Sequence, residues 1–283
     1  MADINRSAFL PAQISNEIIQ KAQEESAVMA LARQITLPGT GVAVPVITAD
    51  PEAAWVGETA AKTVSNSTVS SKLLQPYKLA VIETVSKELT RDASGLYEEL
   101  KRRLPLALAR KFDNTVIGGT NAPGSNFDTF ASCTAQDLGS GAYEGLIAAD
   151  GDVAAHGGIL NGFAISPQAR SILLGATDTT GRPLFINNVA EGAIPMILGA
   201  PTRQNKGLYK TVSGGNNIIG AAGDWTQAVF GIVEGIHIDV SEEATLTSGD
   251  TTINLWQNNM VAIRAEIEIG FRANLEAFNL LTD

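Results

Sequence analysis

The residue types that most often carry catalysis or bind metals are scarce in this chain. Its 283 residues include one cysteine, Cys133, and two histidines, His156 and His237. Cys133 is flanked by serine and threonine with no histidine near it in sequence, so we expect an inert thiol. His237 belongs to an alternating apolar segment and is expected to be a partly exposed strand residue. Histidine-based catalysis and histidine metal sites are therefore not predicted.

Sequence motifs for common reactions are also missing. The chain has no Gly-Lys-Ser/Thr phosphate loop, no Gly-x-Gly-x-x-Gly after a strand and no Gly-x-Ser-x-Gly nucleophile turn. A single cysteine excludes an intramolecular disulfide and a multi-cysteine zinc site. Asp150-Gly151-Asp152 resembles part of a calcium loop, but the remaining oxygen ligands are absent. We predict no catalytic, metal or cofactor site, and a hydrolase with a distributed site is only a remote alternative.

Composition limits the class of protein further. Hydrophobic residues make up 45% and charged residues 18% of the chain, which is enough apolar surface for a sizeable core. The net charge of −10 argues against a generally basic nucleic-acid binder. No apolar run reaches the ~18–20 residues that cross a membrane. No basic segment followed by an apolar run opens the sequence, so we expect no signal peptide and a cytoplasmic, soluble chain.

Two groups of residues are suited to binding rather than catalysis. Trp55 lies in a long stretch rich in Thr, Ser and Ala, where it either packs on its own hairpin or contacts another subunit. We favour contact with another subunit because tryptophan is enriched at interface centres.

Basic residues outnumber acidic ones only in residues 76–113. They either contact nucleic acid or form a solvated helix face that pairs with carboxylates. The basic group comprises Lys101, Arg102, Arg103, Arg110 and Lys111.

Apolar periodicity predicts the elements that position these groups. A long helix carries the basic residues, with Ser94 as its N-cap, a kink at Pro105 and its end at Gly118. Its apolar stripe has a spacing of four residues. The stripe consists of Leu96, Leu100, Leu104, Leu108 and Phe112.

The segment that contains Trp55 predicts a projecting β-hairpin. Residues 42–46 alternate as in a strand, but residues 36–74 offer little to build a core. Residues 79–84 also alternate and predict a separate strand. A short helix is expected after Pro11, capped within residues 15–17.

The remaining chain predicts an α+β domain with short elements. Helices are expected over residues 141–155 and 168–174, and strands near 163–165, 194–198 and 217–220. One alternating segment is expected from Phe230 to Val240, interrupted by Glu234. The clearest strand covers residues 261–271, with Arg264 on the face opposite the apolar residues. We expect the chain to leave the domain of the long helix near Ala135 and to return near Ile236.

Several short motifs follow one another along nearly the whole chain. They are Ala54-Trp55-Val56-Gly57-Glu58, Pro76-Tyr77-Lys78-Leu79-Ala80, Asn121-Ala122-Pro123-Gly124, Ser166-Pro167, Gly181-Arg182-Pro183-Leu184, Leu198-Gly199-Ala200-Pro201, Gly223-Asp224-Trp225, and Arg264 followed by Glu276-Ala277-Phe278. In this order they resemble the tailed-bacteriophage major capsid proteins of the Hong Kong 97 fold. The resemblance implies an α+β fold with four parts. These are an N-terminal arm at 1–38, an extended β-hairpin E-loop at 39–75, a peripheral domain with a long spine helix and long strands at 76–135 and 236–283, and an axial domain at 136–235.

The resemblance also implies a function and partners. The chain would be a structural subunit, not an enzyme, that assembles as pentamers and hexamers into an icosahedral head around double-stranded DNA. Implied partners are a portal protein, a separate scaffolding protein (the sequence shows no long N-terminal scaffolding segment) and weakly contacted DNA. The chain would lie in the virion, and in the host cytoplasm before assembly. An encapsulin shell of the same fold is the alternative.

The resemblance assigns site residues as well. The E-loop residues Trp55, Glu58, Lys62 and Lys72 would contact neighbouring subunits. The basic residues of the spine helix would face the shell interior or an adjacent subunit. Lysine cross-linking between subunits is not predicted.

Overall fold

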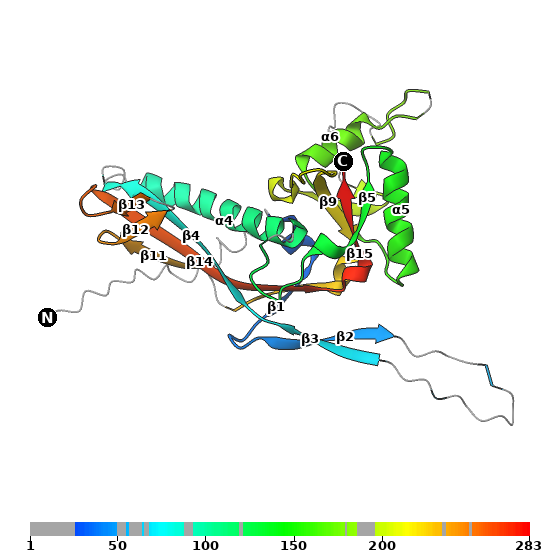
Figure 1. Ribbon diagram of the computed structural model, residues 1–283, viewed down its shortest axis with the longest axis horizontal. Helices are drawn as coiled ribbons and strands as arrows, with labels where there is room; N and C mark the ends of the chain where they lie inside the picture. Colours follow the sequence, from blue (N-terminus) through cyan, green and yellow to red (C-terminus); the bar gives the residue numbers. More distant parts are fainter. Residues whose placement is uncertain are drawn as a thin grey trace.

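Two β-sheets and one long helix organise the chain (Figure 1). The computed structural model describes residues 26–49, 55–56, 64, 68–87, 93–118, 121–178, 180–185, 196–233, 236–248 and 251–283. The long helix lies along the first sheet at one end of the molecule, and the second sheet with its helices forms the other end. The expected α+β class is confirmed.

The first sheet is built around one long strand, β14 (Met260–Ala273). Strand β4 pairs antiparallel along one edge of β14, and β10 and β11 share the opposite edge. Strand β1 adds to β10 in parallel. The other bounds in this sheet are β1 (Arg33–Thr36), β4 (Tyr77–Ser86), β10 (Ala228–Ile232) and β11 (His237–Ser241).

The segment expected to run unbroken from Phe230 to Val240 is two strands. Ile232 pairs with Ile269, and His237 pairs with Glu266. The advance of five residues from Ile232 to His237 is therefore matched by an advance of only three residues on β14, from Ile269 to Glu266. The two extra residues cannot join the ladder, so the strand breaks between β10 and β11.

The long helix α4 (Ala93–Gly118) packs against this sheet through its apolar stripe. Leu104, Leu108 and Phe112 are each no more than 3% exposed, which confirms this part of the stripe. The structure does not describe the side chains of Leu96 and Leu100. The helix continues through Pro105, where the expected kink stays a prediction, and it ends at Gly118 as expected. Ser94 lies inside the helix rather than at its N-cap, so that prediction was wrong: the helical turn already includes Ala93.

The second sheet has six strands in the order β5-β15-β9-β6-β8-β7. Helices α5 (Ala142–Ala155) and α6 (Pro167–Gly175) share one apolar cluster with one face of this sheet. Both helices agree with the sequence prediction. The strand expected at 194–198 is only two residues long. The bounds are β5 (Thr134–Asp137), β6 (Gly162–Ile165), β7 (Met196–Ile197), β8 (Ala200–Gln204), β9 (Ile218–Gly223) and β15 (Phe278–Thr282).

The two sheets exchange strands along the chain. Strand β10, from the predicted axial segment 136–235, lies in the first sheet. Strand β15, from the predicted peripheral segment 236–283, lies in the second sheet. The division into peripheral and axial domains stays a prediction, and the two sheets do not coincide with its boundaries.

Aromatic side chains join the two sheets at the core. Phe271 lies on the buried face of β14, and Phe278 begins β15. Phe130 contacts both rings, with centroid distances of 5.7 Å to Phe271 and 4.6 Å to Phe278. Offset and edge-to-face pairs of this kind add to the free energy gained by burial, so this cluster ties the two ends of the molecule together.

The predicted hairpin is confirmed for its described strands. Strands β2 (Val42–Ala49) and β3 (Thr68–Leu74) pair antiparallel, from Val42 opposite Leu74 outward, and extend beyond the two sheets in Figure 1. Of the expected N-terminal helix, only α2 (Ala27–Leu31) is described; the part after Pro11 lies outside the described residues. The other elements are the hairpin β12 (Thr245–Ser248) and β13 (Thr251–Asn254), and the 3-10 turns η1 (Phe130–Ser132), η2 (Lys206–Leu208), η3 (Trp225–Gln227) and η4 (Leu275–Ala277).

Candidate functional site

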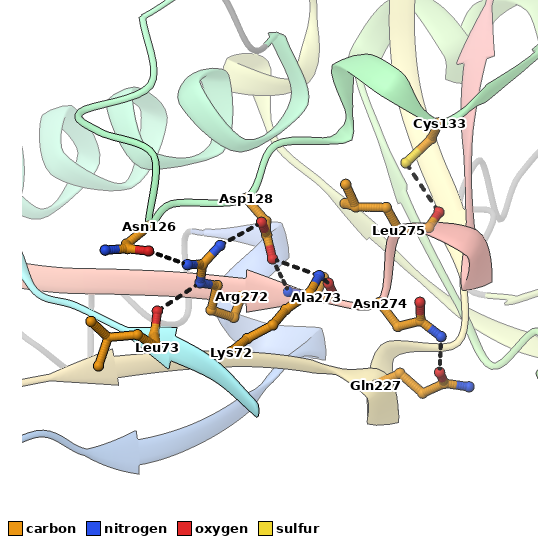
Figure 2. Close-up of polar contacts among 10 residues, drawn as sticks. All are labelled: Lys72, Leu73, Asn126, Asp128, Cys133, Gln227, Arg272, Ala273, Asn274 and Leu275. Atoms are coloured by element: carbon orange, nitrogen blue, oxygen red, sulfur yellow. Dashed lines mark hydrogen bonds and ion pairs between the residues drawn. The ribbon is translucent and has the colours of Figure 1, made fainter. Parts of the chain in front are cut away.

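A hydrogen-bonded cluster fixes the root of the hairpin, and Figure 2 shows its members. Arg272, near the end of β14, donates from Nε to the carbonyl of Leu73 in β3 at 2.8 Å. Its other nitrogens donate to Asp128 Oδ1 at 2.8 Å and to Asn126 Oδ1 at 2.7 Å. The side chains of Arg272 and Asp128 are only 11% and 12% exposed, so water screens this pair weakly. We call Lys72, Asn126, Asp128 and Arg272 the root cluster.

Lys72 belongs to the same cluster. Its Nζ lies 3.3 Å from Asp128 Oδ2 and donates to the carbonyl of Ala273 at 2.9 Å (Figure 2). The amide of Ala273 also donates to Asp128 Oδ2, at 3.1 Å. The expected contact of Lys72 with a neighbouring subunit stays a prediction, and the ammonium already binds within its own chain.

Apolar packing also holds the root of the hairpin. Leu37, Leu74 and Val229 form a small buried cluster between the hairpin and β10. Gly270 in β14 lets the chain at Gln75 approach closely, because a Cβ at this position would lie 2.5 Å from the Gln75 carbonyl oxygen. The hairpin therefore leaves the body at a direction set by both hydrogen bonds and packing.

The far part of the hairpin carries exposed apolar side chains. Trp55 is 104% exposed and Val64 is 88% exposed. The alternative that Trp55 packs on its own hairpin is therefore wrong. Glu58 and Lys62 lie outside the described residues. A fully exposed tryptophan suits contact with another molecule.

Part of the predicted basic cluster lies on the exposed face of α4. Arg103, Arg110 and Lys111 are exposed, while the side chains of Lys101 and Arg102 are outside the described ones. Arg103 and Arg110 line a groove of about 570 Å³ between α4 and β4. Glu83 of β4 and apolar side chains of both elements, including Val81 and Leu106, complete the lining.

A buried carboxylate anchors the start of the described chain. Asp113 in α4 is 0% exposed. It accepts hydrogen bonds from the hydroxyl of Ser26, from the amides of Ala27 (3.0 Å) and Val28 (3.4 Å), and from Asn205 Nδ2 (2.8 Å). Burial raises the pKa of the Asp113 carboxyl to about 7, because desolvation outweighs these four hydrogen bonds. The N-terminal segment is thus fastened to α4 where α2 begins.

Asp113, Asp128 and Arg272 are not among the residues that the sequence predicts to be functional. One signal was available: Asp113 directly follows Phe112 in a helix end rich in apolar residues, and a charge in such a position requires partners. The partners of Asp128 and Arg272 lie up to 199 residues away along the chain, and no local pattern identifies them.

The described residues hold no metal-binding group of three or more His, Cys, Asp or Glu side chains. Cys133 is half-buried and directs its sulfur toward the carbonyl of Leu275, 3.4 Å away (Figure 2). Burial raises the pKa of its thiol to about 12, with added effects of Asp128 and Asp152. The thiol therefore stays protonated near neutral pH, as expected for an inert cysteine. Within the described parts, no helix is long and apolar enough to span a membrane.

Comparison with known proteins identifies the family. The model of the phage capsid family matches residues 7–283. The chain belongs to the phage capsid family. This phage capsid protein is 30% identical to the probable major capsid protein gp17 of Mycobacterium phage L5, over 97% of the chain and 89% of the relative. It is 26% identical to the major capsid protein of Staphylococcus phage 80alpha, over 91% of the chain and 79% of the relative.

Solved structures agree on the fold of the phage capsid protein. It matches a chain from Mycobacterium phage Ogopogo with a TM-score of 0.73, at 21% identity and 92% coverage of both chains. It matches a chain from Gordonia phage Cozz with a TM-score of 0.70, at 24% identity, covering 92% of this chain and 86% of the other. The curated relatives are phage proteins, which favours the phage capsid over the encapsulin alternative.

Proposed function

We propose that this capsid protein is the major subunit of a tailed-phage head and assembles into a closed icosahedral shell from pentamers and hexamers. The observation that carries the proposal is the projecting hairpin. Its root is fixed by the root cluster, while Trp55 farther along is fully exposed. Such a hairpin leaves apolar surface that its own subunit does not cover. A neighbouring copy would cover it, and each chain would thereby complete the structure of another.

The finer expectations belong to the same proposal. The hairpin corresponds to the E-loop, α4 to the spine helix, and the second sheet with α5 and α6 to most of the axial domain. A portal protein and, where scaffolding is needed, a separate scaffolding protein would take part in forming a head that can be filled. The role is structural rather than enzymatic, and the subunit would wait in the host cytoplasm before it enters the virion.

Replacing Trp55 with alanine tests the proposal. The parent chain, expressed with its scaffold where one is needed, is expected to form closed particles by electron microscopy. The W55A subunit is expected to fold normally, because the side chain is fully exposed, but to assemble poorly. Truncating an interface hot spot costs ~2 kcal/mol or more per contact, and a shell repeats each contact many times. A parent chain that stays monomeric at high concentration contradicts the proposal, whereas normal W55A particles exclude only the role of Trp55.

The exposed basic residues of α4 suggest a second, weaker activity. We propose that Arg103, Arg110 and Lys111 face the shell interior and contact packaged DNA non-specifically. The support is their exposure on one helix of an otherwise acidic chain. The competing proposal is that they pair with carboxylates of adjacent subunits and guide assembly.

A double variant, Arg103→Gln with Arg110→Gln, separates the two proposals. Normal particles that retain DNA less well in rising salt support contact with DNA, because each lost phosphate contact lowers the salt slope by about 0.9. Failed particles support pairing between subunits. Arg182→Gln removes an exposed arginine from a different part of the chain and serves as the matched control. Unchanged assembly and unchanged DNA retention would exclude both roles.

A further inference from the structure

Two pairs of exposed apolar side chains lie on the unit formed by the second sheet. Tyr143 and Ile147, one helical turn apart on α5, are 48% and 47% exposed. Met196 and Leu198, at the turn between β7 and β8, are 58% and 46% exposed. Single exposed apolar residues, such as Ile159 and Leu184 on this unit, need no explanation, but neighbouring pairs suggest contact surfaces.

The sheet order places the two pairs on opposite sides of this unit. Strand β5 is at one edge of the six-stranded sheet and β7 at the other, about 24 Å apart at five strand spacings. Helix α5 follows β5 directly and lies beside it in Figure 1. The turn between β7 and β8 is at the far edge. The same subunit therefore cannot bring the two surfaces together.

The backbone at Leu198 is unusual for its residue type. Ile197 pairs with Ala200, which leaves Leu198 and Gly199 as a two-residue turn. Their φ angles are +49° and +80°, the signs of a type I′ turn, which Asn-Gly forms most readily. A leucine in the left-handed region is strained. An exposed, strained leucine at the tip of a turn gains nothing from the fold of its own subunit.

Charge complements the apolar pairs. Helix α5 carries Glu144, Asp150 and Asp152 and no basic residue. Residues 200–210, which follow the β7–β8 turn, carry Arg203, Lys206 and Lys210 and no acidic residue. Arg203 and Lys206 are exposed. The surface of α5 is therefore acidic around its apolar pair. Arg203 places a positive charge on β8, the strand that follows the β7–β8 turn, whereas Lys206 and Lys210 lie where the chain meets α4.

We infer that the β7–β8 turn of one copy packs on the outer face of α5 of the next copy, with Met196 and Leu198 against Tyr143 and Ile147. The inference rests on the proposed assembly and names the surfaces that would join its axial units. Two different surfaces on opposite sides make a head-to-tail contact. Repeated by a rotation that closes, this contact generates a ring, as pentamers and hexamers require.

Replacing Leu198 with asparagine tests the turn surface. Leu198→Asn relieves the backbone strain, so the thermal midpoint of the subunit should stay equal or rise. The concentration needed for assembly should rise ~tenfold or more, because an interface anchor is lost. Ile159→Asn changes an apolar side chain that is 78% exposed but lies outside both surfaces, and should leave assembly unchanged. Unchanged assembly of Leu198→Asn would overturn the inference.

Disulfide trapping tests the pairing directly. The double variant Ile147→Cys with Leu198→Cys, oxidised after assembly, should give a ladder of covalent oligomers up to pentamers and hexamers. Each single variant also contains Cys133, so it controls for disulfides formed by that thiol, and it should give no ladder. Particles of the double variant without a ladder would overturn the pairing, because Cα atoms within about 7 Å are needed for the bond. Absence of particles from the parent chain would instead overturn the proposed function.

Discussion

Replacing Arg272 with alanine is expected to lower the free energy of unfolding by about 3–5 kcal/mol, the usual cost of removing one partner of a buried ion pair. Asp128 would keep only the Ala273 amide, at 3.1 Å, and Lys72, which is 35% exposed and 3.3 Å away. The carbonyl of Leu73 and the side chain of Asn126 would also lose their donor. The hairpin root should loosen, so backbone amides in β2 and β3 should exchange hydrogen faster. Denaturant unfolding and hydrogen exchange measure the two effects.

A second arginine on the same strand provides the control. Arg264 in β14 pairs with Asp239 of β11, but its side chain is 47% exposed. An exposed ion pair contributes about 0–1 kcal/mol to the free energy of unfolding, so Arg264→Ala should change stability little. Hydrogen exchange of the backbone amides in β2 and β3 should stay unchanged. Equal losses for the two alanine variants would contradict the assigned role of the root cluster.

Asp113→Ala is expected to lower the free energy of unfolding by at least as much as Arg272→Ala. Four donors, from Ser26, Ala27, Val28 and Asn205, would lose their acceptor inside the protein. A buried donor without a partner costs about 1–3 kcal/mol, so even with relaxation the loss should be several kcal/mol. That is a large share of the ~5–15 kcal/mol that stabilises a typical domain. Ser26→Ala, which removes one donor and keeps the carboxylate, should cost less. A loss for Asp113→Ala no larger than for Ser26→Ala would contradict this assignment.

The raised pKa of Asp113 also predicts a pH dependence. Its folded-state pKa of about 7 exceeds the unfolded value of 3.8, so the folded protein binds this proton more strongly between these pH values. The contribution of the group to stability is therefore full below about pH 4 and is lost as the pH rises to about 7. Asp113→Asn cannot titrate, so the stability advantage of the parent over this variant should be larger at pH 5 than at pH 8. Urea unfolding at both values measures it, and an advantage that grows with pH would contradict the shift.

The sequence determined the elements whose residues interact locally or repeat along one face. The alternation in β14 and the four-residue stripe in α4 each report one face of one element, and the described faces are buried as predicted. The hairpin also followed from the sequence, because a long segment with strand propensity and little apolar content cannot enter the core. The exposure of Trp55 agrees with that reasoning.

Only the tertiary structure decided which distant groups meet. Asp113 binds Ser26 across 87 residues, and Arg272 binds Asp128 across 144 residues. Periodicity describes the face on which a side chain lies but not the partner that another segment brings to it. For the same reason the sequence did not predict that β15 joins the second sheet or that β10 and β11 divide one edge of β14, since both depend on register between segments far apart in the chain.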